Sequence, residues 1–96
     1  MKNYDLKFLE VALKEWKKLD RPVREQFKRK LAERLENPRV ESARLSTMPD
    51  CYKIKLAALG YRLVYQVVDS TVTVTVVSVG KRERSAVYAA AIARLK

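Results

Sequence analysis

Histidine is absent from this chain, and cysteine, glycine and proline are scarce, with one, two and three copies in 96 residues. Without histidine the chain cannot build a Ser-His-Asp or Cys-His nucleophile, a histidine pair for RNA cleavage, or most zinc sites. The single Cys51 excludes an internal disulfide and fits a reducing compartment. The carboxylates are scattered rather than clustered. We therefore expect no two-magnesium nuclease site, no other metal and no cofactor.

Long apolar runs and export signals are also missing. No apolar run approaches the ~18 residues that a membrane span needs. The segment from Met1 to Asp5 lacks the apolar core of a signal peptide. No predicted helix is basic on one side with large aromatic residues on the other. We therefore expect no membrane partner and a cytoplasmic location.

Positive charge is what the chain has in excess. It contains 21 Lys and Arg residues against 11 Asp and Glu residues, a formal net charge of +10. Such a field favours polyanions, and of nucleic acid, an anionic membrane and an acidic protein, nucleic acid is the partner that best fits the absences above. The length suits a single globular domain over residues 1–96 with one core.

The first half of the chain predicts a short strand followed by two helices. Residues 4–9 alternate as a strand does, and from Leu9 the apolar residues follow a helical stripe that ends near Asp20. Pro22 suits the first turn of a second helix, which Asn37 and Pro38 end. The short connection predicts an antiparallel helical hairpin.

Basic residues lie on the outer side of this predicted hairpin. Arg21, Arg24 and Lys28 form a strip, with Lys17 and Lys18 nearby. Charged outer faces are what soluble helices normally show, so simple solvation is one interpretation. The other is binding to the phosphate backbone of a large RNA without regard to its sequence.

The second half is patterned as β-structure. Residues 51–56, 61–68 and 72–79 alternate and predict an antiparallel meander, and a short strand over 40–45 is expected to add an edge. A final alanine-rich helix is expected over 85–96, with Ser85 as its N-cap. The predicted fold is α+β: a short N-terminal strand and a helical hairpin packed on one face of a small antiparallel sheet, with a C-terminal helix.

The register of the meander brings positive charges together. A four-residue turn over 57–60 places Lys55 opposite Arg62, with Lys53 on the same face. A two-residue turn at 69–70 would place Arg62 across from Val77. Like charges directly opposite each other cost roughly 0.2–1 kcal/mol. Either these long cations splay into water or the face binds an anion.

The turn after the last strand adds further cations and a tyrosine. Lys81, Arg82 and Arg84 follow the third strand of the meander, and Tyr88 falls in the first turn of the last helix. Positive surroundings favour the phenolate form of a tyrosine, which makes Tyr88 a candidate base. The alternative is ordinary packing on a helical stripe with Ala91, Ile92 and Leu95.

These segments resemble the RelE family of ribosome-dependent mRNA interferases, the toxin halves of bacterial toxin–antitoxin pairs. The likeness covers nearly the whole chain with its spacing kept. It is carried by residues Leu13 to Trp16, Val23 to Gln26, Met48 to Leu56, Gly60 to Val67, and Ser78 to Ser85 with Val87 and Tyr88.

The resemblance implies a RelE-like fold and a metal-independent endoribonuclease that cuts mRNA in the ribosomal A site, with the ribose 2′-hydroxyl as nucleophile. It implies catalytic roles for Lys53 and Lys55 at the charged phosphate, Arg62 at the scissile phosphate, Arg82 as acid or charge stabiliser, and Tyr88 as base. RNA-binding roles are expected for Lys81, Arg84, Arg21, Arg24 and Lys28. The implied partners are the 70S ribosome, through its rRNA and A-site mRNA, a RelB-like antitoxin, and operator DNA only as the toxin–antitoxin complex.

Two departures from the family pattern keep other interpretations open. Ser46 and Ala57 stand where many relatives carry arginine. A defective toxin that titrates antitoxin is therefore one alternative. A non-catalytic binder on the same scaffold, such as a ParE-like gyrase inhibitor or a passive rRNA-binding protein, is the other.

Overall fold

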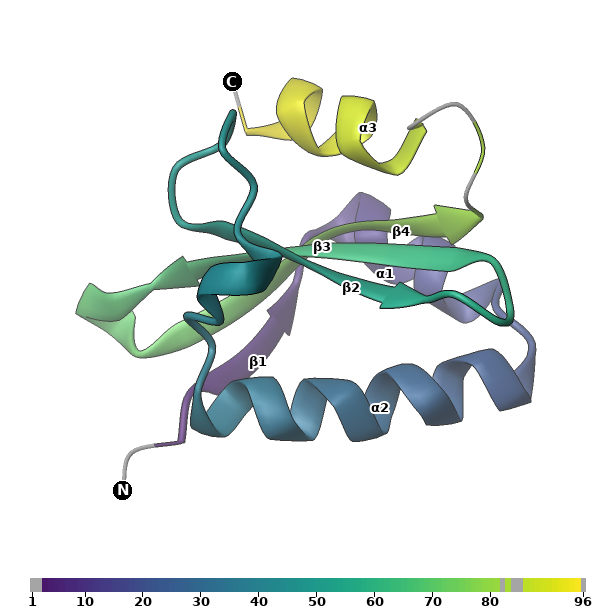
Figure 1. Cartoon of the computed structure of the whole chain (residues 1–96), viewed down its shortest axis with the longest axis horizontal. Helices are drawn as coiled ribbons and strands as arrows, with labels where there is room; N and C mark the ends of the chain where they lie inside the picture. The colour runs from purple at the N-terminus through teal and green to yellow at the C-terminus, as the bar shows by residue number, and fades with distance from the viewer. Residues whose placement is uncertain (1–2, 82, 84–85, 96) are drawn as a thin grey trace.

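A computed structural model describes residues 3–81, 83 and 86–95 of the chain. Strands and helices follow one another in a single α+β arrangement, shown in Figure 1. In chain order they are β1 (Asp5–Phe8), α1 (Glu10–Lys17), α2 (Arg21–Glu36), the 3-10 helix η1 (Glu41–Ala43), β2 (Cys51–Leu56), β3 (Tyr61–Val68), the 3-10 helix η2 (Asp69–Thr71), β4 (Thr73–Lys81) and α3 (Ala86–Arg94).

The four strands form one sheet in the order β1-β4-β3-β2. The pairs β2–β3 and β3–β4 are antiparallel, which confirms the predicted meander. The predicted α+β class is also confirmed. The N-terminal strand, however, does not lie on a face of the sheet: β1 joins its edge parallel to β4, with Leu6 opposite Val74, so the sheet is mixed rather than antiparallel.

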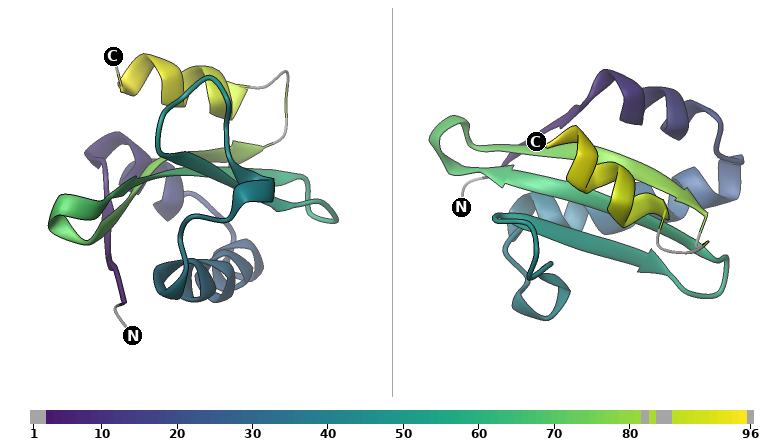
Figure 2. Two further views of the ribbon diagram at one scale, coloured as in Figure 1. Left: turned by 60° about the vertical axis from the view of Figure 1, so that its left-hand side comes forward. Right: turned by 90° about the horizontal axis from the view of Figure 1, so that it is seen from above.

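Helices cover both faces of this sheet. Figures 1 and 2 show α1 and α2 on one side and α3 on the other. The β2–β3 turn ends on Gly60, whose φ of +72° lies in the left-handed region that glycine adopts without strain. Among the described residues, no helix has both the length and the apolar character that crossing a membrane requires.

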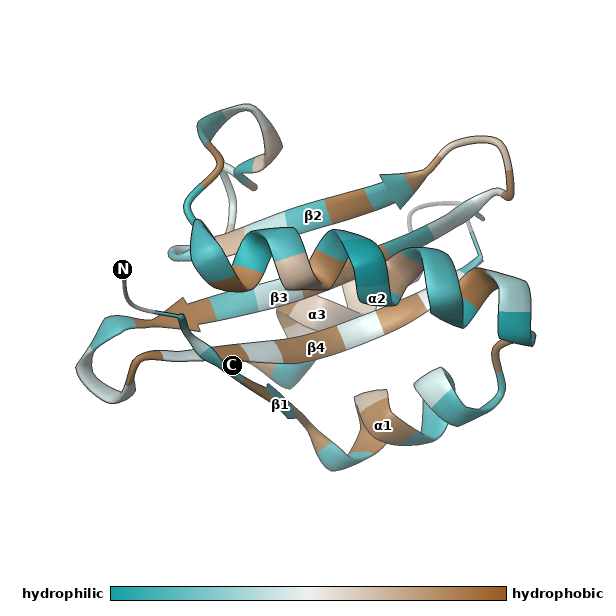
Figure 3. Cartoon of the chain, turned by 90° about the horizontal axis from the view of Figure 1, so that it is seen from below, coloured by the Kyte–Doolittle hydropathy of each residue, from teal (hydrophilic) through white to brown (hydrophobic). Residues whose placement is uncertain are grey.

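The main core lies between the sheet and the first two helices. Val23, Phe27 and Leu31 recur every four residues along α2 and are buried, as the sequence pattern predicts. Figure 3 shows the hydrophilic outer side of α2 above the hydrophobic positions of β3 and β4. Trp16 joins α1 to this core, because its ring lies 5.3 Å from the ring of Phe8 and 6.1 Å from that of Phe27.

A second, smaller core lies under α3. Val87 and Ala91 of the helix pack there against Val64 and Val77 of the sheet. Cys51 and Met48 complete it. Ile92, which the packing interpretation of Tyr88 placed on the same helical stripe, is 38% exposed.

The register of the second hairpin differs from the prediction. The connection at 69–72 is a 3-10 turn that ends on Val72 in a left-handed conformation (φ 50°), so Val68 pairs with Thr73 rather than Thr71. A β-bulge between Val64 and Tyr65 shifts the pairing again, and Arg62 lies opposite Gly80 instead of Val77.

The bulge also changes which side chains face each core. Val76 and Val79 both belong to the main core, although strict alternation would place them on opposite faces. Ser78, between them in the chain, faces α3 and donates a hydrogen bond from Oγ to the Val87 carbonyl (2.7 Å). Strict alternation from Val77, which belongs to the second core, would place Val79 on the α3 face, whereas it packs in the main core.

The edge strand expected over 40–45 is also wrong. The segment forms η1, in which the Ala43 N–H donates to the Val40 carbonyl (2.9 Å). An isolated bridge between Arg44 and Tyr52 joins it to the sheet, with a hydrogen bond from the Leu45 N–H to the Cys51 carbonyl (3.0 Å). Burial of Ala43 favours the tight turn over an extended edge.

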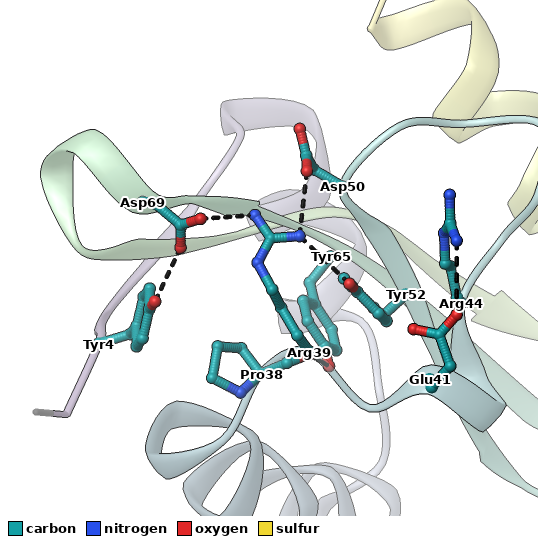
Figure 4. A network of polar contacts seen from close by, with 9 residues as sticks. All are labelled: Tyr4, Pro38, Arg39, Glu41, Arg44, Asp50, Tyr52, Tyr65 and Asp69. Carbon is teal, nitrogen blue, oxygen red and sulfur yellow. Dashed lines mark hydrogen bonds and ion pairs between the residues drawn. The ribbon is translucent and has the colours of Figure 1, made fainter. Parts of the chain in front are cut away.

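Polar contacts fix the loops at the end of the sheet where β3 leads into β4, which is the end away from the β2–β3 turn (Figure 4). Arg39 donates to Asp50 (3.0 Å), to the Tyr52 hydroxyl (3.2 Å) and to Asp69 (2.8 Å). The Tyr4 hydroxyl also donates to Asp69, at 2.7 Å. One guanidinium thus ties together loops that are distant in sequence.

Candidate functional site

Three cations project from the β2–β3 hairpin on the face that α3 partly covers. Lys55 pairs directly with Arg62, as predicted from the turn length, and Lys53 pairs with Val64. Lys53 and Lys55 share a face because they alternate with the core residues of β2. Lys55 is exposed, while Lys53 and Arg62 are partly buried.

Arg62 and Tyr88 form the centre of this site. The guanidinium carbon of Arg62 lies 5.1 Å from the centroid of the Tyr88 ring, within the range of a cation–π contact. Within the described part of the chain, Arg62 Nε and the Tyr88 hydroxyl are buried and have no hydrogen-bond partner. Buried polar atoms are normally paired, and leaving one unpaired costs about 1–3 kcal/mol. A polar group that formed hydrogen bonds with these two atoms would offset that cost.

The end of β4 allows Tyr88 to reach Arg62. Gly80 lies opposite Arg62, so no side chain from that position fills the space beside it. A Cβ on Gly80 would lie 3.6 Å from Val87 Cγ2, which shows how closely the first turn of α3 approaches the strand. The first turn of α3 therefore lies directly over the end of β4 that pairs with Arg62.

Of the residues predicted to act in the turn after β4, one is described by the structure and the others are not. Lys81 ends β4, is exposed and pairs with Tyr61, so it shares the end of the sheet with Arg62 but points to the other face. Arg82, predicted to be catalytic, Arg84, predicted to bind RNA, and the predicted cap Ser85 lie outside the described residues.

Three cations at this end of the sheet have no acidic partner in the described part of the chain. None of the ion pairs among residues 3–81, 83 and 86–95 involves Lys53, Arg62 or Lys81. In the same ranges, no group of three or more cysteine, aspartate and glutamate side chains could hold a metal ion. The side chains themselves offer cations that can bind a phosphate, next to the phenol of Tyr88.

A second basic surface lies between α1 and α2. Arg21, Arg24 and Lys28, with Lys17, line a hollow of about 690 Å³ whose floor includes Leu13 and Trp16. Lys28 also pairs with Glu25 at 3.3 Å, with both side chains largely exposed. Figures 1 and 2 place the α1–α2 connection at the same end of the molecule as the β2–β3 turn and the end of β4. This hollow and the Arg62 site therefore face the same end.

Two residues that sequence reasoning did not single out hold α3 against the sheet. Arg94 makes paired hydrogen bonds to Glu15, from Nη1 to Oε1 (2.8 Å) and from Nη2 to Oε2 (3.0 Å). They are 79 positions apart in the sequence. No local pattern connects them, and only the fold brings them together.

Comparison with known proteins gives a consistent match. The family model described as the ParE toxin of the type II toxin-antitoxin system parDE matches residues 6–86. The mRNA interferase toxin RelE of Escherichia coli strain K12 is 63% identical over 92 residues, which are 96% of this chain and 97% of that protein.

Solved structures match equally well. A mutant of E. coli toxin RelE in the free state superimposes with a TM-score of 0.91 at 60% identity, covering 98% of this chain and 99% of that one. The intact E. coli RelBE toxin–antitoxin complex contains a chain that matches with a TM-score of 0.81 at 64% identity, covering 84% of this chain and 99% of that one.

Proposed function

Because the chain belongs to the RelE family of type II toxin–antitoxin toxins, within the RelE and ParE superfamily, we propose that it is an mRNA interferase that cleaves mRNA in the ribosomal A site. In this proposal residues 1–96 form one catalytic domain that works in the cytoplasm, inhibits translation and needs no metal. The match to the E. coli mRNA interferase over nearly its full length supports the assignment.

The observation that carries the proposal is the contact between Arg62 and Tyr88 beside the Lys55–Arg62 pair. Its two buried, unpaired polar atoms would gain hydrogen-bond partners from the phosphate and the ribose of a bound RNA. A gyrase inhibitor or a passive rRNA-binding protein has no evident use for a phenol held in this way.

The proposed reaction is attack by the ribose 2′-hydroxyl on the adjacent phosphorus. Tyr88 in its phenolate form accepts the proton of the nucleophile, and the bond from phosphorus to the 5′ oxygen breaks, which leaves a 2′,3′-cyclic phosphate on one fragment. The departing 5′ oxygen becomes a 5′-hydroxyl by taking a proton from Arg82 or from water. Arg62 holds the scissile phosphate, and Lys53, Lys55 and Arg82 neutralise the charge that develops. Each well-placed donor contributes roughly 2.7–4 kcal/mol to such a transition state.

The basic hollow supplies the other half of the proposal. Arg21, Arg24 and Lys28, together with Lys81 and Arg84, bind backbone phosphates of the ribosomal RNA and mRNA. The position of Arg21, Arg24 and Lys28 at the same end of the molecule as Arg62 supports an end of the protein that turns toward the ribosome. A site this open gains from a large partner that orients the substrate.

The proposed protein partner is a RelB-like antitoxin. The relatives with solved complexes are bound to RelB, and the matching chain of the RelBE complex is 64% identical to this one. We propose that this antitoxin displaces α3 and with it Tyr88, and that operator DNA is bound only by the toxin–antitoxin complex.

Mapping mRNA 5′ ends after brief expression tests the catalytic proposal. We expect cuts in phase with the ribosomal A site for the natural protein and for Lys30→Ala, an exposed control on α2. Arg62→Ala and Tyr88→Phe should each reduce the cuts strongly. Intact mRNA with inhibited gyrase would favour the ParE-like alternative, and antitoxin binding without translational arrest would favour a defective toxin.

A further inference from the structure

The C-terminal helix that carries Tyr88 buries little apolar surface. Within α3 only Val87 and Ala91 are buried, and Ile92 is 38% exposed. Because hydrophobic stabilisation scales with the apolar area removed from water, small side chains hold this helix weakly. Polar contacts must therefore contribute a large share of its docking.

Those polar contacts are concentrated at the last turn of the helix. Besides its paired bonds to Glu15, Arg94 donates from Nη1 to the Val77 carbonyl at 2.8 Å. The side chains of Arg94 and Glu15 are only 19% and 33% exposed. A two-point, partly buried pair of this kind is stronger and more directional than an exposed ion pair.

Glu15 is held in turn by the sheet. Its Oε1 accepts a hydrogen bond from the Val79 N–H at 3.2 Å. The partner strand β1 ends where Phe8 pairs with Val76, so on that side the next backbone groups of β4 have no strand beside them. Glu15 and Arg94 occupy that edge and satisfy Val79 and Val77. One ion pair thus connects α1, the edge of β4 and the end of α3.

The carboxylate form of Glu15 is stable in this setting. Partial burial alone would raise its pKa, but the hydrogen bonds from Arg94 and Val79 and the charges of Arg94 and Lys18 outweigh that effect and lower it. The same pairing with Glu15 raises the pKa of Arg94. Both partners are therefore charged at neutral pH.

We propose that Glu15 and Arg94 are positioning residues for the cleavage site: their ion pair fixes the orientation of α3 on β4 and so holds Tyr88 over Arg62. Tyr88 and Arg94 lie on one continuous helix, Ala86–Arg94, so a tilt at its last turn displaces its first. The Ser78 hydrogen bond to Val87 holds that helix at a single point near Tyr88 and does not fix its direction. This inference rests on the cleavage activity proposed above.

We call the Glu15–Arg94 ion pair the latch. The test compares three latch variants, Glu15→Gln, Arg94→Gln and their double variant, with two exposed controls on α2, Glu33→Gln and Arg29→Gln. Hydrogen exchange of the α3 amides reports docking independently of activity. We expect it to accelerate about 10- to 100-fold in each latch variant, the factor that a lost charge-assisted hydrogen bond gives, while β2 and β3 amides stay protected. The controls should match the natural protein.

Cleavage of ribosome-bound mRNA gives the second readout. We expect kcat to fall about 10- to 100-fold in the latch variants with little change in KM, because misplacing a catalytic group by about 1 Å has this size of effect. The double variant should lose about as much as the more affected single variant, since each single change already breaks the Glu15–Arg94 ion pair. Arg94→Lys, which keeps one charged contact, should fall between.

The outcomes separate the two proposals. If the natural protein cuts no mRNA, the proposed function fails, and exchange alone still decides whether the latch holds the helix. If α3 exchange rises while kcat is unchanged, the positioning role is overturned. Unchanged exchange or additive losses in the double variant also overturn it. If Glu15→Gln does not fold, Arg94→Lys decides: natural exchange and natural kcat in that variant would contradict the proposal.

Discussion

The guanidinium of Arg62 lies over the ring of Tyr88, 5.1 Å from its centroid, and joins the third strand to the last helix. The first residue comes from an inner strand of the sheet and the second from a helix that buries only Val87 and Ala91. Both keep a buried polar atom without a partner among the described residues. Unpaired buried polar groups destabilise a fold. Two of them in one contact are typical of a site that a ligand completes.

Tyr88→Phe separates folding from function. Because the phenol has no partner within the described chain, removing it should leave the free energy of unfolding unchanged within about 0.5 kcal/mol or raise it slightly. Cleavage of ribosome-bound mRNA should fall about 10²- to 10⁴-fold, the contribution of a general base. Urea unfolding and single-turnover cleavage measure the two effects. A loss of stability above about 1 kcal/mol would show that the hydroxyl has a structural role.

The basic hollow should govern affinity rather than chemistry. Replacing Arg21, Arg24 and Lys28 together by alanine should weaken ribosome binding and make its salt dependence shallower, by up to about 0.7 in log–log slope for each lost phosphate contact. The rate at saturating ribosomes should stay within a few-fold of the natural value. Alanine at the exposed cations Lys7, Arg29 and Lys30 removes the same charge elsewhere and serves as the control. Equal salt slopes for the two triple variants would argue against a phosphate-binding role for the hollow.

Tyr65→Phe should destabilise the fold. The buried Tyr65 hydroxyl donates to the Pro38 carbonyl at 2.6 Å and accepts from Arg34 Nη1 at 2.9 Å. Burial raises the pKa of this hydroxyl despite the opposing effect of Arg34, so it remains a donor at neutral pH. Its loss leaves a buried carbonyl unpaired and should cost about 1–3 kcal/mol.

Thermal unfolding measures this loss at about 4–8 °C per kcal/mol for a domain of this size. Tyr61→Phe is the matched control, because that partly exposed hydroxyl has no hydrogen bond among the described residues. Equal midpoints for the two variants would contradict the prediction.

Cys51 should resist alkylation in the folded protein. Burial, with a smaller contribution from the charge of Asp50, raises the pKa of its thiol to about 11. The thiolate is the reactive form, so iodoacetamide at pH 8 should react at least about 100-fold more slowly with the native protein than with the urea-unfolded chain. Comparable rates would show that the segment around Cys51 opens readily.

The same shift sets a direction for stability at high pH. The folded state binds the thiol proton more tightly than the unfolded chain does. The stabilisation is therefore complete below the unfolded pKa of about 8.5 and is lost as pH rises toward about 11. Denaturant midpoints across this range should fall less in Cys51→Ala than in the natural protein.

Local patterns predicted much of the fold. The helical stripes of α2, the bounds of β2 and β3, and the Lys55–Arg62 pairing depend on periodicity and on one short turn, which the sequence displays directly. The second hairpin was misread because nothing local in the sequence marks the left-handed conformation of Val72. The bulge does have a local sign, since the valines at positions 72, 74 and 76 change phase at Val77 and continue at Val79, but strict alternation passes over it.

The amino-acid sequence by itself determined the class of fold, the excess of positive charge, and a set of candidate residues that contains no histidine. Tertiary structure alone decided that Arg62 faces Gly80 and Tyr88, and that Glu15 and Arg94 hold the last helix. The physical reason is the separation in sequence of the residues that must meet. Periodicity reports which side of an element is buried, whereas register and helix docking depend on contacts between residues up to 79 positions apart.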